Sequence, residues 1–116
     1  MSEGSAASAL ELLLGQAAAT AGAGVLVSDD TARLVAANSA ACKLLGYTRE
    51  QLLQLRLTYI ADRASGIVES SREVVEGKIR HGTASVRRKD GESFPAQWVS
   101  VPARLDGLPY VLTLLW

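Results

Sequence analysis

The sequence predicts an α+β domain in which helices gather on one face of a five-stranded antiparallel sheet. Three observations lead to this prediction. Two short β-rich runs stand at 24–29 and 32–37, helical patterns fill the middle of the chain, and two Asp-Gly pairs join the last three β-rich runs. An Asp-Gly pair between such runs is a strong hairpin signal. Two strands, a helical middle and three antiparallel strands together make an α+β domain.

Composition sets the class of protein. The chain has 116 residues, of which 48% are hydrophobic and 21% charged, which is typical of one globular domain. Twelve Lys and Arg balance twelve Asp and Glu, so no net charge attracts a polyanion or an anionic membrane. One cysteine forms no internal disulfide, no segment reads as a signal peptide, and the apolar runs are too short to span a bilayer. A soluble, cytoplasmic module is expected.

Residues 1–23 are predicted to form a flexible tip followed by an amphipathic helix at 9–19. Glu11 is the only charge in this helix, and Gly22 follows it as a C-terminal signal. Its apolar stripe has helical spacing and consists of Leu10, Leu13, Leu14 and Ala17. A helix with so little charge needs an apolar surface, so it either covers its own sheet or pairs with a second copy.

The residues after the first two strands carry helix signals. Asn38 stands as an N-cap before 39–45, and Gly46 stands where a C′ glycine belongs. Thr48 and Gln51 then form a capping box that opens a second short helix.

The second half begins with a helical pattern and ends with strands. "LRLTYIADR" contains about one helical turn, and 65–79 has one apolar stripe that includes Val74 and Ile79. Strands are predicted at 81–89, 92–104 and 108–116. They are joined by the turn pairs Asp90-Gly91 and Asp106-Gly107.

These segments carry motifs of a known family. "AANSAACKLLGYTREQLL", "ADR" and "RRKDGESFPAQWVSVP" occur in the order and at the spacing in which similar segments occur in PAS domains. The chain from 24 to 116 therefore resembles a PAS core domain, which implies the sheet order 2-1-5-4-3. Two departures stand out: the first hairpin turn lacks a glycine, and the Asp-Ile-Thr that often follows the last strand is absent. The resemblance implies an output domain beyond Trp116, with a free-standing domain as the alternative.

The cations Arg87, Arg88 and Lys89 stand beside a turn. Such a charge run is usually a solvated loop tip that keeps a sheet edge soluble. Because the net charge is zero and no aromatic residues alternate with these cations, a nucleic-acid partner is not expected.

No pattern of catalytic or metal-binding residues is present. The chain has one His and one Cys, and its carboxylates at 65–79 alternate with basic residues as solvated ion pairs do. We therefore expect neither an enzyme nor a metal site.

A cofactor is not identified by the sequence. In haem-binding PAS domains the ligand His usually lies on the long helix, where this chain has Glu76, and His81 follows that helix. Cys42 is not in the segment that forms a cysteinyl–flavin adduct in light-sensing relatives. The absence of any cofactor is favoured, and non-covalent flavin or, behind it, haem remains an open alternative.

The resemblance also implies a cleft between the sheet and the helices, where a small-molecule ligand could bind. Its apolar candidates are Val27, Leu45, Ile60, Ile67, Val68, Val75, Trp98 and Leu112. Its polar candidates are Tyr59, Ser71, Gln97 and Ser100. The alternative is that these side chains simply fill the core.

Association is the best-supported activity. The helix at 9–19 resembles the N-terminal helix by which many PAS domains form homodimers across the outer sheet face. Its contact is placed near Val111, Thr113 and Leu115, or on the alternate register of the same strand. The sequence thus predicts a PAS sensory or interaction module of a histidine kinase, cyclic-dinucleotide enzyme or transcription regulator, with a cofactor-based sensor as the alternative.

Overall fold

The computed structural model describes residues 22–62, 66, 74 and 76–116. The strands in this part of the chain are β1 (Gly24–Ser28), β2 (Leu34–Ala37), β3 (Arg80–Arg87), β4 (Ser93–Leu105) and β5 (Leu108–Leu115). The helices are α2 (Ser39–Leu45), α3 (Arg49–Leu52) and α4 (Leu57–Ile60). The predicted helix at 9–19 and most of the one at 65–79 lie outside the described residues.

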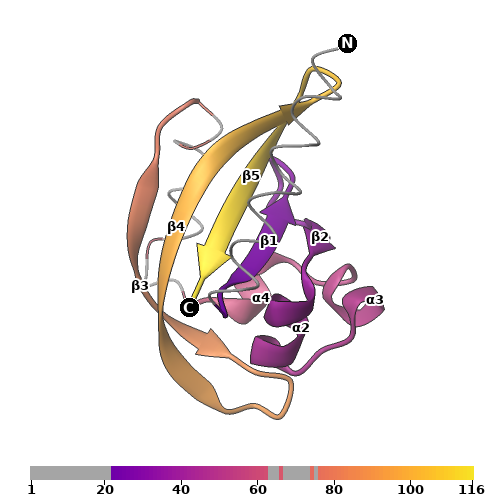
Figure 1. The fold of residues 1–116 in the computed structure, drawn as a ribbon, viewed down its shortest axis with the longest axis vertical. Helices are drawn as coiled ribbons and strands as arrows, with labels where there is room; N and C mark the ends of the chain where they lie inside the picture. Colours follow the sequence, from indigo (N-terminus) through magenta and orange to yellow (C-terminus); the bar gives the residue numbers. More distant parts are fainter. Residues whose placement is uncertain (1–21, 63–65, 67–73, 75) are drawn as a thin grey trace.

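The five strands form one antiparallel sheet in the order β2-β1-β5-β4-β3, which confirms the predicted fold class and strand order. Figure 1 shows α2, α3 and α4 grouped together beside the sheet and the long strand β4 bending across it. The side of the sheet that packs against these helices, with Leu26, Trp98 and Leu115, is called the inner face. The opposite side, with Val25 and Leu112, is called the outer face.

Asn38 joins β1 to α2, as its predicted cap role requires. Its side-chain oxygen accepts hydrogen bonds from the backbone N–H of Ala41 and of Val25, both at 2.9 Å. The first bond caps the helix, and the second supplies a partner to a backbone group of β1. A Cβ on Gly24 would lie 3.0 Å from the Cα of Ala41, so only glycine lets α2 approach β1 this closely.

The first hairpin turn is built without glycine, by a carboxylate. One oxygen of Asp29 accepts hydrogen bonds from the backbone N–H and hydroxyl of Thr31 and from the backbone N–H of Arg33. Ala32 takes the left-handed conformation, with φ 68°, that glycine usually takes in such turns. The three bonds to Asp29 stabilise a turn whose backbone would otherwise be unfavourable for alanine.

The other predicted caps are confirmed. Gly46 is left-handed with φ 81°, and its N–H donates to the carbonyl of Cys42. Thr48 and Gln51 form a reciprocal capping box at the start of α3. The Asp106-Gly107 pair makes a two-residue turn with positive φ at both positions, between the paired residues Leu105 and Leu108.

Two predicted boundaries are wrong. The helix at 65–79 does not extend to Ile79, because Gly77 takes φ 103° and donates its N–H to the carbonyl of Val74. Ile79 is 63% exposed as a result, whereas Val74 is buried as the stripe predicted. The loop at Asp90-Gly91 is also wider than a two-residue turn, because strand pairing stops at Arg87 and Ser93.

The core lies between the inner face and the helices. Its largest fully buried side chains include Leu26, Leu45, Leu52, Leu57 and Ile60, so every described helix contributes to it.

Short connections also protect the sheet edges. Leu34 of β2 donates to the carbonyl of Leu55, and residues 61–62 pair with β3 near Ser85. No helix in the described part of the chain is long and apolar enough to cross a membrane.

Candidate functional site

Four of the predicted cleft residues lie on the inner side of the sheet or pack against it. Leu45, Ile60 and Trp98 belong to one buried cluster, and Ser100 is buried two residues from Trp98 on the same face of β4. These residues come from α2, α4 and β4, so tertiary packing brings together segments far apart in the sequence. Their packing also satisfies the alternative interpretation, in which they fill the core.

Buried polar atoms distinguish the inner face from an ordinary core. The hydroxyls of Ser100 and Thr113 lie 2.7 Å apart and share a hydrogen bond. The indole Nε1 of Trp98 and the hydroxyl of Ser28 are buried and have no hydrogen-bond partner among the described residues. A buried donor without a partner costs roughly 1–3 kcal/mol. The inner face can therefore donate hydrogen bonds to an acceptor from outside the described part of the chain.

Gly82 fixes the position of the Trp98 ring. A Cβ on Gly82 would lie 3.2–3.3 Å from three atoms of the indole, including Nε1. The ring therefore lies against the backbone of β3, the neighbouring strand. Neither Gly82 nor Ser28 was among the predicted site residues, because an isolated glycine or serine in a strand pattern carries no signal that distinguishes it from others.

Three predicted cleft residues lie on the wrong side of the sheet. Val27 and Leu112 pack in the outer cluster. Gln97 is exposed and adjacent to Trp98, so its side chain points to the face opposite the indole. A shift of one residue moves a side chain to the other face of a strand, and the sequence does not fix which alternation faces the helices. Tyr59 is also outside the cleft, with 51% of its surface exposed.

The remaining cleft predictions, Ile67, Val68, Ser71 and Val75, lie outside the described residues. Cys42 is half-buried on α2 and packs against the core. His81 is exposed and pairs with Val99, on the alternation that faces outward. Within the described ranges, no three His, Cys, Asp or Glu side chains gather as metal ligands.

The outer face carries a second apolar cluster. Ala23, Val25 and Leu112 are buried there, and Val27, Val101 and Leu114 pack against them. The predicted dimer residues Val111, Thr113 and Leu115 instead face inward, where Leu115 belongs to the main core and Thr113 bonds to Ser100. The alternate register of β5, with Leu112 and Leu114, is therefore the outward one. Leu10, Leu13, Leu14 and Ala17 lie outside the described residues.

The three cations Arg87, Arg88 and Lys89 contact side chains elsewhere in the protein as well as solvent. The guanidinium of Arg87 lies 5.7 Å from the ring centroid of Tyr59, and that of Arg88 lies 4.7 Å from that of Phe94. Lys89 donates its backbone N–H to the carbonyl of Leu45 and its ammonium to the side-chain oxygen of Gln51. These two hydrogen bonds connect the tip of the β3–β4 hairpin to α2 and α3. The sequence interpretation of a freely solvated tip missed these contacts.

Comparison with known proteins identifies the architecture. A family model described as PAS domain matches residues 22–115. A domain of a sensory box sensor histidine kinase/response regulator from Geobacter sulfurreducens superposes with a TM-score of 0.71 at 23% identity, covering 82% of each chain. A PAS domain from Desulfitobacterium hafniense has a TM-score of 0.69 and 26% identity, covering 80% of this chain and 90% of that one.

A light-oxygen-voltage domain studied with a flavin analogue also has this fold. It superposes with a TM-score of 0.70 at 22% identity, covering 87% of this chain and 81% of that one. No curated protein matches the chain significantly.

Proposed function

The chain belongs to the PAS domain family, and we propose that it acts as a homodimer that relays a signal to an output domain beyond Trp116. PAS domains are sensory modules, and a solved structure similar to this chain comes from a sensor histidine kinase. The output domain of this protein would be a histidine kinase, a cyclic-dinucleotide enzyme or a transcription regulator of bacterial type. The domain itself would be a cytoplasmic, non-enzymatic module without a membrane or nucleic-acid partner.

The observation that supports this proposal is the apolar outer face. Soluble sheets with one solvated face alternate apolar and polar residues, whereas β5 is apolar on both faces. Leu112 and Leu114 form a cluster with side chains of β1 and β4, so the apolar surface crosses three strands. Val27, Val101 and Leu114 of this cluster remain partly exposed, and a second copy that packs on them and on the helix at 9–19 can bury the roughly 1,000 Å² that a stable dimer needs.

Relay of a signal to the output domain would follow from the position of β5 in the sheet. β5 pairs with β1 and β4, and its last residues lead to Trp116. A signal that favours one arrangement of the dimer over another shifts the population of that arrangement, and the end of β5 moves with it.

A second candidate is a sensor that binds a cofactor without covalent attachment. It is favoured by the unpartnered donors Trp98 Nε1 and Ser28 Oγ, because flavin presents carbonyl oxygens and ring nitrogens as acceptors. Haem is not supported by the described residues, because their one His, His81, lies on the outward alternation.

Native mass spectrometry tests both candidates in one measurement. The dimer proposal predicts twice the subunit mass, and Leu114→Asp should give monomers because a buried carboxylate opposes association. Gln97→Glu is the matched control, since it adds a charge at an exposed outward position of β4 outside the apolar cluster. Leu13→Asp tests the N-terminal helix independently.

The outcomes separate clearly. A monomeric wild type at micromolar concentration would contradict the dimer proposal. A native mass that exceeds the denatured mass by the mass of a small molecule, with absorbance at about 450 nm, would favour the flavin sensor. Circular dichroism of each variant must match that of the wild type for a monomer to count as evidence.

A further inference from the structure

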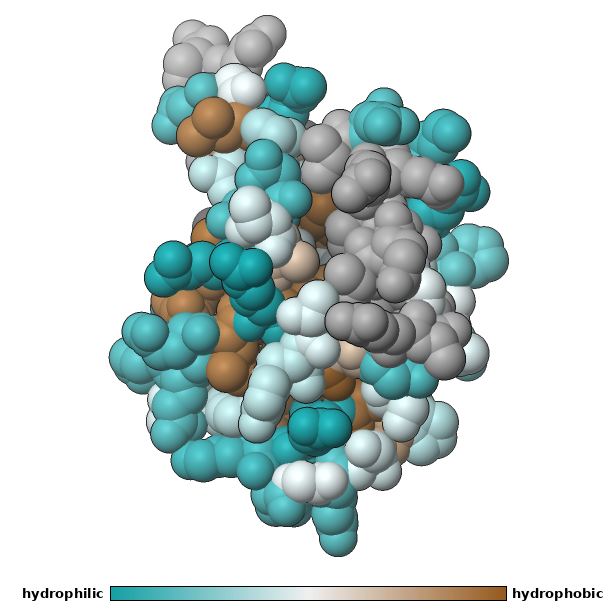
Figure 2. Space-filling view, turned by 180° about the vertical axis from the view of Figure 1, so that it is seen from behind, coloured by the Kyte–Doolittle hydropathy of each residue, from teal (hydrophilic) through white to brown (hydrophobic). Residues whose placement is uncertain are grey.

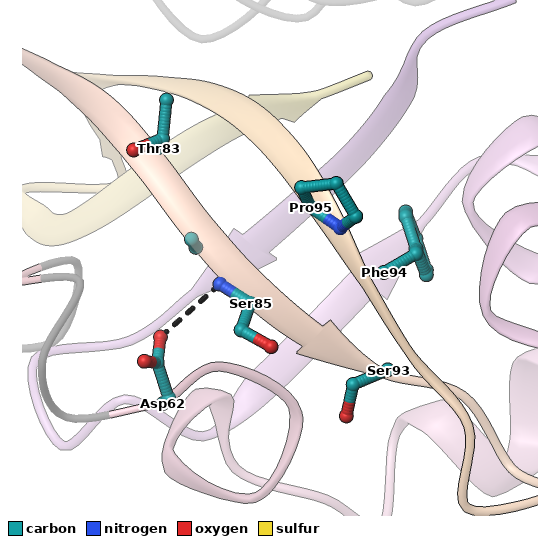
Figure 3. A pocket seen from close by; sticks show the side chains of 7 residues that line it. Asp62, Thr83, Ser85, Ser93, Phe94 and Pro95 are labelled. Carbon is teal, nitrogen blue, oxygen red and sulfur yellow. Dashed lines mark hydrogen bonds between the residues drawn. The ribbon is translucent and has the colours of Figure 1, made fainter.

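Two adjoining pockets lie where residues 61–62 meet the edge of β3. Asp62 donates its backbone N–H to the carbonyl of Ser85, and its side-chain oxygen accepts from the backbone N–H of Ser85, both at 3.2 Å. One pocket, of about 400 Å³, extends over β3 and β4, and the other, of about 220 Å³, extends toward α4. Both are lined by Asp62, Ser85 and Ser93. Figure 3 shows these side chains around the first pocket.

The pocket toward α4 has charges of both signs in its wall. Asp62 lines one part of it and Arg87 another. Ser85 and Arg87 are two residues apart on β3, so they point to the same side at a separation of about 7 Å. Thr58 of α4 and Ser93 of β4 add hydroxyl groups to the lining of the same pocket.

Among the residues that the structure describes, the partner that holds Arg87 in position is an aromatic ring rather than a carboxylate. Its guanidinium packs over the ring of Tyr59, a contact worth roughly 0.5–1 kcal/mol at an exposed site. Tyr59 in turn neighbours Tyr47, where burial and the Tyr59 hydroxyl together raise the pKa of Tyr47 despite the opposing charge of Arg87. The guanidinium therefore keeps its hydrogen-bond donors available for an anionic group.

The pocket over β3 and β4 supplies an apolar wall. Pro95 supplies the apolar side chain of this wall, because it pairs with Ser85 and shares its outward alternation. Ala84 and Phe94 also line the pocket, but they lie on the inward alternation and pack in the core. A ligand whose charged groups lie between Asp62 and Arg87 could extend an apolar substituent along this wall.

We propose that this paired pocket binds a small zwitterion of the α-amino-acid type. Its carboxylate would bind the Arg87 guanidinium, its ammonium would bind the Asp62 carboxylate, and its apolar side chain would lie against Pro95. A simple anion would be repelled by Asp62 and a simple cation by Arg87, whereas each charge of a zwitterion would lie beside the opposite charge of the pocket. The site lies at the edge of β3, apart from the inner-face donors, and it does not depend on the dimer proposal.

Titration of the ¹⁵N-labelled full chain, followed by amide shifts, tests the proposal with four probes. L-leucine has both charges and an apolar side chain. N-acetyl-L-leucine lacks the ammonium, L-leucine methyl ester lacks the carboxylate, and glycine lacks the side chain. We expect saturable shifts at Ser85, Arg87 and Ser93 with L-leucine at about millimolar Kd, and at least ~10-fold weaker binding of each other probe.

Variants test the two charges separately. Arg87→Gln and Asp62→Asn should each weaken L-leucine binding ~10-fold, which corresponds to about 1.4 kcal/mol. Asp62→Asn keeps an oxygen that can accept from Ser85, so the edge pairing is retained. Arg49→Gln is the control, since it removes an exposed cation of α3 outside the pocket and should leave binding unchanged.

Two results would overturn the proposal. One is the absence of saturable shifts at these residues up to about 10 mM L-leucine. The other is equal binding of L-leucine and both blocked analogues, since recognition would then not involve both charges. Neither result bears on subunit number, so a failure here is distinguishable from a failure of the dimer proposal.

Discussion

At the scale of single residues, side-chain hydrogen bonds to the backbone decide the local conformation. Asp29 shows this most directly, because one oxygen accepts three hydrogen bonds within the first hairpin turn. Partial burial by itself would raise the pKa of Asp29, but the bonds from Thr31 and Arg33 outweigh it and hold the pKa below its ordinary value. The turn is therefore stabilised by the ionised form of Asp29.

This coupling predicts a pH dependence for Asp29→Asn. The folded-state pKa is lowered, so the stabilisation is present above the unfolded-state value of about 4 and is lost as pH falls through the folded-state pKa. Urea denaturation at a series of pH values should show the wild type more stable than Asp29→Asn at pH 7, with the difference shrinking below about pH 4.

The control is Asp30→Asn, which removes the neighbouring exposed carboxylate and leaves all three turn bonds in place. A difference between wild type and Asp29→Asn that stays constant from neutral to acid pH would show that the charge of Asp29 does not stabilise the turn.

At the scale of helices and strands, the side chains that cap a helix also bind a second, distant segment of the chain. Asn38 serves α2 and β1 together, and Gln51 serves its own capping box and the ammonium of Lys89. The cap roles could be predicted because capping is a local pattern of three or four residues. The second partner of each side chain comes from 13 and 38 positions away, so it was decided by the fold.

Asn38→Ala should therefore lower the free energy of unfolding by more than the loss of an ordinary N-cap does. Loss of the N-cap bond costs about 1 kcal/mol, and the N–H of Val25 would lose its side-chain acceptor, which adds roughly 1–2 kcal/mol. We expect a total loss of about 2–3 kcal/mol in the free energy of unfolding, measured by urea denaturation with an unchanged m-value.

Asn38→Asp is the matched variant. It keeps the acceptor oxygen for Ala41 and Val25, and it replaces the long 3.4 Å donation to the carbonyl of Ala23 with an oxygen that cannot donate to that carbonyl. It should retain most of the stability. Equal losses in the two variants, or a loss under about 0.5 kcal/mol in Asn38→Ala, would contradict the double role.

At the scale of the whole molecule, burial is divided between two apolar clusters on opposite faces of one sheet. The inner cluster contains Leu26 and the helices, and the outer cluster contains Val25 and Leu112. Figure 2, seen from behind, shows apolar surface at the end of the molecule where the β4–β5 hairpin projects, beside the hydrophilic side chains around it. Leu108 of this hairpin is 57% exposed, whereas Leu26 is 1% exposed.

These two leucines allow a matched test of the core. Leu26→Ala should lower the free energy of unfolding by roughly 2–5 kcal/mol, because it removes buried methyl groups and leaves a cavity. Leu108→Ala makes the same chemical change at the exposed hairpin tip and should cost less than about 0.5 kcal/mol. Thermal and urea denaturation measure the free energy of unfolding of both variants. Similar decreases in the two variants would contradict the assignment of Leu26 to the core.

The sequence by itself determined the order of the elements, the family and the caps at Asn38, Gly46 and Thr48. These features depend on residues within a few positions of one another. Of the predicted cleft residues, Leu45, Ile60, Trp98 and Ser100 are buried on the inner side of the sheet, and their role in ligand binding stays a prediction.

Only the tertiary structure decided which alternation of each strand faces the helices. Val111, Thr113 and Leu115 face the helices and Leu112 faces away, although both sets on β5 are almost wholly apolar. A strand that is apolar on both faces gives no local preference between its two registers, so the register is set by pairing with β1 and β4. The same holds for Asp62 and Arg87, which meet at one pocket only because residues 61–62 pair with the edge of β3.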